Sequence, residues 1–256
     1  MTLGLNLDNR SALITGVSGA IGSHLASTFI ERGAHVAGTY RTRAAEAADA
    51  LASAGSGQST LLWADVNSPA SARELWRRAE DWRAMDTLIV NAAAMTNTPL
   101  TGDDNDAWDD GWQHSLQVNV IGAATLMREA ALSFAERGFG TIIAISSWAA
   151  EQGSRIPDIS SYAASKAALR NFAQTLARAY ARQGVRVYAI APGVVDGGMG
   201  TSGYDPDEIQ ETANGLAMGQ LVDPKEVAEI AAFLATDRCP SMTGSTIDLN
   251  GASYIR

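Results

Sequence analysis

Short apolar segments alternate with longer helical segments along almost the whole chain, and this alternation limits the folds that it can adopt. The strand candidates are Ser11–Thr15, His35–Tyr40, Thr60–Asp65, Thr87–Asn91, Thr141–Ser147, Arg186–Ala191 and Thr246–Leu249. The helix candidates are Ala20–Arg32, Ala44–Ala54, Ala70–Trp82, Trp108–Glu136, Tyr162–Gln183 and Pro224–Ala235. Several strand candidates are apolar on both faces, as expected for strands that helices cover from both sides. The sequence therefore predicts an α/β fold with a doubly wound, seven-stranded parallel sheet and helices on both faces.

The residues at the ends of these segments support the assignment. Gly33 and Gly184 stand where a left-handed residue ends a helix. Ser68-Pro69 and Asp223-Pro224 each combine a capping side chain with a proline suited to the first helical position. Since seven strands account for the chain, we expect residues 1–256 to form a single domain.

Composition and charge exclude several classes of protein. A chain of 256 residues is long enough to bury a core without disulfides or metals. Its single cysteine, Cys239, excludes an intramolecular disulfide and is typical of a reducing compartment, so we expect a cytoplasmic protein. The net charge of -9 argues against nucleic acid or an anionic membrane as the main partner. No uncharged apolar run approaches the ~18–20 residues that cross a bilayer.

A glycine-rich loop follows the first strand. It reads Thr15-Gly16-Val17-Ser18-Gly19-Ala20-Ile21-Gly22, and a helix begins within it. Glycines allow a tight turn and a close approach to a phosphate, and the helix N-terminus offers unpaired N–H groups to a pyrophosphate. A tight turn without a ligand is the alternative interpretation. The position between the first strand and the first helix favours a dinucleotide site. Its predicted contacts are Gly16, Ser18, Gly19, Ile21 and Gly22.

The end of the second strand indicates which dinucleotide binds. An acidic residue there would bind the ribose hydroxyls and repel a 2′-phosphate, but this chain has Tyr40-Arg41-Thr42-Arg43. A guanidinium pairs with a phosphate through charge-assisted and often bidentate hydrogen bonds. Tyr40 and Arg41 therefore favour NADP(H) over NAD(H). The alternative is that Arg41 and Arg43 are solvated residues at the start of a helix.

Four further residues form a candidate catalytic group. Tyr162 and Lys166 are four residues apart on a predicted helix, which places the phenol and the ammonium on one face. A nearby ammonium and a nicotinamide cation favour the phenolate, so we expect the pKa of Tyr162 to be lowered. Ser147 ends the fifth strand and can hold a carbonyl oxygen. Asn119 lies in an apolar helical stretch, where its amide needs either a structural bond or a water relay.

Taken in order, these residues resemble those of the short-chain dehydrogenase/reductase family, in its compact branch with a single Rossmann-type domain. The resemblance covers essentially the whole chain. It depends on the Thr15–Gly22 loop, Asp65-Val66 after the third strand, Asn91-Ala92-Ala93-Ala94 after the fourth, Pro192-Gly193 after the sixth, and on Asn119, Ser147, Tyr162 and Lys166.

The resemblance implies a role for each position. Tyr162 is then the general acid in reduction and the base in the reverse direction. Lys166 lowers the pKa of that phenol and binds the nicotinamide ribose, Ser147 hydrogen-bonds the reacting carbonyl, and Asn119 holds a water that links Lys166 to solvent. The further cofactor contacts that it implies are Asp65, Val66, Asn91, Ala92, Pro192, Gly193 and Val195. The resemblance also implies a homotetramer.

The chain departs from the family pattern at four points. Ala20 replaces the second glycine of the loop, and Asn91-Ala92-Ala93-Ala94 lacks one amide and one glycine. Gly197 replaces a threonine, and Ser147 precedes Tyr162 by 15 positions where 13 is common. These departures suggest a divergent member with altered cofactor affinity.

Two segments are candidates for the substrate site. Residues 197–215 begin with a glycine-rich stretch after a strand, where we expect a flexible lid, with an ordinary surface loop as the alternative. The candidate substrate contacts are Ser147, Trp148, Ile156, Met199 and Tyr204. No metal is expected, because Asp103, Asp104, Asp106, Asp109 and Asp110 fit no calcium loop and instead suit the start of a helix.

The sequence thus predicts an NADPH-dependent reductase that converts a small carbonyl substrate to a secondary alcohol. The alternatives are an NAD-dependent alcohol dehydrogenase running in the oxidative direction and a non-catalytic nucleotide-binding regulator. A 3-oxoacyl reductase that takes its substrate from an acyl carrier is a further version. Such reductases carry arginines at positions that here hold Gly138 and Gln183, next to Arg137 and Arg182.

Overall fold

The computed structural model describes residues 5–101 and 104–255 and contains a sheet of seven parallel strands. The strands are β1 (Ser11–Ile14), β2 (His35–Tyr40), β3 (Ser59–Trp63), β4 (Thr87–Val90), β5 (Gly140–Ile145), β6 (Val185–Pro192) and β7 (Thr246–Leu249). Their order is β3-β2-β1-β4-β5-β6-β7, so the strand order reverses between β1 and β4. In such sheets the ligand crevice opens at that reversal, beyond the carboxyl ends of the strands. The predicted fold is confirmed.

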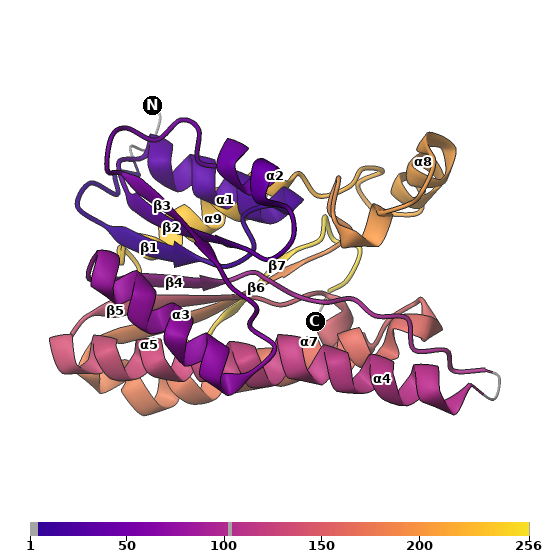
Figure 1. The fold of residues 1–256 in the computed structure, drawn as a ribbon. Coiled ribbons are helices and arrows are strands. Elements are labelled where there is room, and N and C mark those ends of the chain that lie inside the picture. The colour runs from indigo at the N-terminus through magenta and orange to yellow at the C-terminus, as the bar shows by residue number, and fades with distance from the viewer. Residues whose placement is uncertain (1–4, 102–103, 256) are drawn as a thin grey trace.

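Helices cover both faces of the sheet (Figure 1). One face carries α1 (Ala20–Glu31), α2 (Ala44–Asp49) and α9 (Pro224–Ala235). The other carries α3 (Pro69–Trp82), α5 (Ala123–Arg137) and α7 (Ser160–Tyr180), with α4 (Asn105–Leu116) beside α7. Short 3-10 turns lie at Pro157–Ile159, Ala181–Gln183, Met199–Thr201 and Pro240–Met242. No helix in the described part of the chain is long and apolar enough to cross a membrane.

Neighbouring residues of the central strand enter opposite layers of the core. Leu13 packs in the layer under α3 and α5, whereas Ile14 packs in the layer under α1 and α9, and both are fully buried. This alternation requires apolar residues at every position of the strand, because side chains in a strand point to the two faces in turn. It explains why the strand candidates were recognisable as continuous apolar runs.

The predicted helix boundaries are confirmed at four places. Gly33 and Gly184 have φ of 92° and 80° after helical segments, in the left-handed region that glycine adopts readily. The Ser68 side chain accepts a hydrogen bond from the Ser71 N–H, and that of Asp223 accepts one from the Lys225 N–H. Asp104 caps α4 in the same way, which accounts for one of the clustered aspartates; Asp103 lies outside the described residues.

The predicted helix over Trp108–Glu136 is present as an unbroken helical segment from Asn105 to Arg137, but its middle is not α-helical. α4 ends at Leu116, a π-helical turn follows over Gln117–Gly122, and α5 then begins. The wide turn contains the buried Asn119 and brings the backbone of Gly122 against the segment after β3, where a Cβ atom at Gly122 would lie 1.7 Å from the Val66 carbonyl oxygen. Two helices were not predicted, α6 (Ala149–Gln152) and α8 (Pro206–Asn214). The fifth strand ends at Ile145, before Ser147.

Candidate active site

Two adjoining cavities lie along the carboxyl edge of the sheet. The first has a volume of about 260 Å³ and lies over the glycine loop and the ends of β2 and β4. The second has a volume of about 570 Å³ and lies over the ends of β5 and β6. Ile21, Asn91, Gly198 and Met199 line both cavities, so one continuous crevice joins them. A ligand with two linked halves therefore fits along this edge.

The glycine loop forms the floor of the first cavity. Gly16 has a φ of 74°, and its N–H donates to the Thr39 hydroxyl at 3.0 Å. A Cβ atom at Gly22 would lie 2.1 Å from the Gly16 carbonyl oxygen, so only glycine lets α1 start this close to the loop. At Gly19 the nearest atom to a Cβ would be 3.7 Å away, an ordinary van der Waals contact, so the approach to the helix N-terminus is less tight there. This geometry suits a phosphate held by backbone N–H groups.

Asn91 and Thr15 fix the shape of that loop. The Asn91 amide nitrogen donates to the carbonyl oxygens of Thr15 and Gly16, at 2.9 and 3.1 Å. The Thr15 hydroxyl in turn accepts hydrogen bonds from the N–H groups of Asn91 and Ala92, both at 2.9 Å. Asn91 was predicted as a contact of the cofactor. In the structure it also has a structural role, because it links the ends of β1 and β4. This structural role of Thr15 was not predicted.

Positive charge gathers at the outer end of the first cavity. Arg41 and Arg43 both line it, and an Arg43 guanidinium nitrogen lies 3.9 Å from the position of a Cβ atom at Gly19. Tyr40 ends β2 beside them, and Asp65 and Val66 line the same cavity. The sequence predicted Arg41 as the contact of the phosphate, with the alternative that Arg41 and Arg43 are both solvated residues at the start of a helix. The structure brings both arginines to the cavity.

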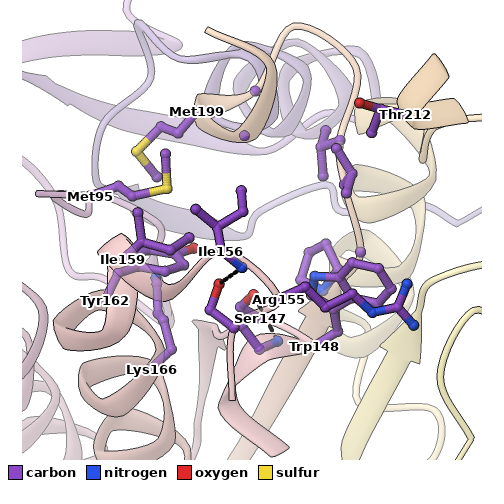
Figure 2. A pocket seen from close by; sticks show the side chains of 18 of the residues that line it. Met95, Ser147, Trp148, Arg155, Ile156, Ile159, Tyr162, Lys166, Met199 and Thr212 are labelled. Carbon is purple, nitrogen blue, oxygen red and sulfur yellow. Dashed lines mark hydrogen bonds between the residues drawn. The ribbon is translucent and has the colours of Figure 1, made fainter. Parts of the chain in front are cut away.

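Tyr162, Ser147 and Lys166 come together in the wall of the second cavity (Figure 2). The Ser147 side chain lies close enough to the Tyr162 hydroxyl to favour the phenolate. The Lys166 ammonium lies 5.7 Å from the centre of the Tyr162 ring and donates to the Ile145 carbonyl oxygen at 2.7 Å. A bond from the Ser146 hydroxyl to the Lys166 carbonyl oxygen, at 3.1 Å, joins the end of β5 to α7 a second time.

Burial dominates the proton affinities of this group. It raises the pKa of Tyr162 to about 12, although the nearby Ser147 side chain acts in the opposite direction. It lowers the pKa of Lys166 to about 8. The expectation of a lowered phenol pKa is therefore wrong for the protein alone, because desolvation disfavours the phenolate more than its polar neighbour favours it. At neutral pH Tyr162 carries its proton, which is the form that a general acid needs.

Asn119 faces the same helix from the π-helical turn. Its amide oxygen accepts from the Ala94 N–H at 2.7 Å, and its amide nitrogen donates to the Ala94 carbonyl oxygen at 2.7 Å and to the Ser165 hydroxyl at 2.9 Å. The Ser165 hydroxyl in turn donates a hydrogen bond to the Tyr162 carbonyl oxygen at 2.7 Å. Both hydrogens of the amide are used, so Asn119 makes the structural bond that the sequence allowed. The water relay stays a prediction. Because both amide hydrogens are used, a water bound by Asn119 can hydrogen-bond only to its oxygen atoms.

The wall of the second cavity is largely apolar around the reacting groups. Figure 2 shows Tyr162 and Met95 at one end, Trp148 and Arg155 at the other, and Met199 on the facing side. The Arg155 guanidinium lies 5.5 Å from the centre of the Trp148 ring. The structure brings all five substrate candidates into this wall, namely Ser147, Trp148, Ile156, Met199 and Tyr204. Other lining residues were not predicted: Met95, Gln152, Arg155, Ile159 and Leu216.

All the predicted cofactor contacts also line the two cavities. The first cavity holds Gly16, Ser18, Gly19, Ile21, Gly22, Tyr40, Arg41, Asp65, Val66, Asn91 and Ala92. The second holds Tyr162, Lys166, Pro192, Gly193 and Val195. Residues 197–215 contain the turn Met199–Thr201 and α8, and several of them line the second cavity from outside the sheet. In Figure 1, α8 stands away from the body of the domain.

Three comparisons identify similar proteins. A family model described as enoyl-(acyl carrier protein) reductase matches residues 16–251. The chain is 32% identical to the oxidoreductase UcpA of Escherichia coli (strain K12), covering 97% of this chain and 96% of that protein. It is 30% identical to the 3-oxoacyl-[acyl-carrier-protein] reductase FabG of Vibrio harveyi, covering 98% of this chain and all of that protein (100%).

A solved structure is similar over the same extent. A 3-oxoacyl (acyl-carrier-protein) reductase of Agrobacterium tumefaciens C58, crystallised with NADP bound, superposes with a TM-score of 0.86 at 31% identity. The match covers 98% of this chain and 97% of that one. With the strand order, the glycine loop and the Ser147, Tyr162 and Lys166 group, these matches show that the chain belongs to the short-chain dehydrogenase/reductase family of NAD(P)-dependent oxidoreductases.

Proposed function

We propose that this protein is an NADPH-dependent reductase that converts a ketone to a secondary alcohol, with Tyr162 as the general acid. The observation that carries the proposal is the position of the protonated Tyr162 side chain beside Ser147, in the wall of a cavity continuous with the crevice over the glycine loop. NADPH supplies a hydride to the carbonyl carbon when it is bound. The residues of this chain must then orient the carbonyl and protonate its oxygen.

Each residue of the group has a distinct part in that step. The Ser147 hydroxyl donates to the carbonyl oxygen and polarises it, as a preorganised donor does for developing negative charge. As the carbon gains the hydride, the carbonyl π-electrons move to oxygen, which takes the proton from Tyr162 and leaves a phenolate. Lys166, held by the Ile145 carbonyl oxygen, stabilises that phenolate and offers hydrogen bonds to the ribose. Asn119 positions α7 through Ser165.

The residues at the first cavity favour NADPH as the donor. Arg41 and Arg43 line it on the side where β2 ends, and the related Agrobacterium reductase was crystallised with NADP. NADH, with oxidation of an alcohol, is the alternative direction. A non-catalytic regulator is disfavoured because a buried Lys166 with a lowered pKa, next to a phenol with a raised pKa, is costly to keep without a reaction that uses it.

The choice of nucleotide is tested at Arg41. We expect Arg41→Ala to raise the KM for NADPH about 10- to 100-fold, since a charge-assisted hydrogen bond contributes roughly 1.5–3 kcal/mol. The KM for NADH should change little, because NADH lacks the 2′-phosphate. Steady-state kinetics with both nucleotides check this, and Arg43→Ala measures the share of the second arginine. An equal loss with both nucleotides would contradict the assignment.

The buried Lys166 predicts a pH dependence of cofactor binding. Its pKa of about 8 means that the ammonium is charged below pH 8 and neutral above it in the free enzyme. An anionic dinucleotide binds the charged form more tightly, so the Kd for NADPH should rise roughly tenfold between pH 7 and pH 9.5. Fluorescence titration of NADPH measures this. Lys166→Met should bind more weakly and show a flat profile, and a parallel slope in that variant would assign the effect to another group.

The substrate is proposed as a free ketone with an apolar body, which the walls around Met95, Ile156 and Met199 suit. A substrate on an acyl carrier is the second candidate, supported by the similarity to FabG. Arg137, the arginine near the position expected to grip an acidic carrier, is committed elsewhere: it pairs with Glu80 and donates to the Met85 carbonyl oxygen. It also precedes β5, at the sheet edge opposite the cavities of this chain.

A panel of ketones and alcohols, followed by NADPH absorbance, tests the function. Reduction of at least one ketone by the wild-type protein, and its loss in Tyr162→Phe, is the expected result. We further propose that residues 197–215 act as a lid that closes over the substrate and that the protein works as a cytoplasmic homotetramer. The lid proposal is supported by positive φ values at Gly197 and Gly203, at either side of the turn that carries Met199.

A further inference from the structure

One face of α7 is joined to the segment after β5 at three successive turns. Tyr162, Lys166 and Arg170 are spaced four residues apart, so their side chains lie along one stripe of the helix. The first two make the contacts with Ser147 and Ile145 already described. The third turn adds an ion pair that the reaction itself does not use, between the Arg170 guanidinium and the Glu151 carboxylate.

The ion pair holds α6, which carries Glu151. This helix is a single turn of four residues, too short to be stable without contacts to the rest of the protein. It begins two residues after Ser147, and the Ala149 N–H donates to the Ser147 hydroxyl oxygen at 3.2 Å. Ala149 and Ala150 are buried, but their methyl side chains do little to fix the orientation of the helix. A contact that fixes α6 therefore also fixes the Ser147 hydroxyl.

The surroundings of the pair make it stronger than an ordinary surface contact. The side chains of Arg170 and Glu151 are 19% and 23% exposed, so water and salt screen their attraction only in part. Without the pair, the covalent path from Ser147 to Tyr162 runs through residues 153–156, which form neither helix nor strand. Bonds of Lys166 and Ser146 hold the end of β5 against α7, and the ion pair adds a contact at the far end of α6, beyond Ser147.

We propose that the Glu151–Arg170 ion pair is a positioning device that keeps the Ser147 hydroxyl in place beside Tyr162 in the wall of the second cavity. It closes a ring of contacts that runs from Tyr162 to Ser147, through α6 to Glu151 and Arg170, and back along two turns of α7. Neither Glu151 nor Arg170 lines a described cavity, so neither touches the substrate. The inference rests on the proposed function, in which Ser147 and Tyr162 act together.

The experiment compares single variants with an exchanged pair. Glu151→Gln and Arg170→Gln each break the ion pair, and the double variant Glu151→Arg with Arg170→Glu restores it in reverse. We expect kcat for ketone reduction to fall about tenfold in each single variant, since small displacements of reacting groups cost this much or more. The Kd for NADPH should change less than about twofold, and the exchanged pair should recover kcat to within about threefold.

Hydrogen exchange of the backbone amides of residues 146–153 supplies a readout that needs no activity. Exchange should accelerate in both single variants and return toward the wild-type rate in the exchanged pair. Glu74→Gln is the matched control, because it removes one carboxylate from the exposed pair with Arg77 on α3.

The outcomes separate this inference from the proposed function. If Glu151→Gln or Arg170→Gln has the same kcat as Glu74→Gln, the positioning role is refuted. It is also refuted if amide exchange of residues 146–153 accelerates in these variants while kcat stays unchanged. If the wild-type protein reduces no ketone, the proposed function fails and the exchange rates alone decide whether the ion pair holds the Ser147 segment.

Discussion

Replacement of Tyr162 by phenylalanine is expected to lower kcat for ketone reduction by about 10³-fold or more. The variant loses the hydroxyl that donates the proton, and general acid catalysis contributes typically 10²- to 10⁴-fold. Ser147 keeps its bond with the Ala149 N–H, so the loss reports the missing acid rather than a displaced serine. Single-turnover absorbance of NADPH measures the chemical step directly.

The fold should survive this substitution. Phenylalanine keeps the ring, and the removal of a hydroxyl whose pKa burial has raised to about 12 takes away no charge at neutral pH. We expect the melting temperature to change by only a few degrees and the Kd for NADPH to stay within about threefold of wild type. Activity close to that of the wild type would refute Tyr162 as the acid.

Replacement of Gly22 by alanine is expected to cause a large loss of stability. The new Cβ atom would lie 2.1 Å from the Gly16 carbonyl oxygen and 2.9 Å from the Asn91 amide nitrogen. The backbone of the loop must move, at a cost of about 3 kcal/mol or more. For a chain of this size that lowers the melting temperature by roughly 10 °C. Thermal unfolding without nucleotide measures this.

Gly19→Ala is the matched control in the same loop. Gly19 has a φ of -93°, which alanine adopts without strain, and its Cβ atom would meet no atom closer than 3.7 Å. We therefore expect its melting temperature to stay near that of wild type, while its Kd for NADPH rises because the methyl group enters the space for the phosphates. Equal melting temperatures for the two variants would show that the close approach at Gly22 is relieved at little cost.

The sequence predicted the fold and most of the site because both depend on local patterns. Strands buried on two faces read as apolar runs, and the glycine loop, Tyr162 and Lys166 lie at fixed distances from the strand and helix ends that carry them. Parallel strands bring their carboxyl ends to one edge, so residues after different strands meet there without any further information.

The remainder depends on contacts between distant segments. The bonds of Asn119 to Ala94 and Ser165 favour a π-helical turn, and nothing in the apolar spacing of residues 108–136 reports them. The same holds for the pKa of Tyr162. The sequence showed the neighbouring ammonium but not the loss of water around the phenol, and this desolvation raises the pKa of Tyr162. The ion pair of Glu151 with Arg170 joins residues that no motif connects.

The turn over Gln117–Gly122 also restricts how this chain can change in length. A π-helical turn accommodates one residue more than an α-helical turn between the same two ends. The number of residues between α4 and α5 therefore matters. If one residue is lost, even the half-exposed Ile121, the segment can form an ordinary α-helix, and α4 and α5 keep their packing. Such a chain can still fold while Asn119 no longer meets Ser165. A related chain with an insertion or deletion of one residue at this turn can therefore keep the fold and lose the catalytic activity.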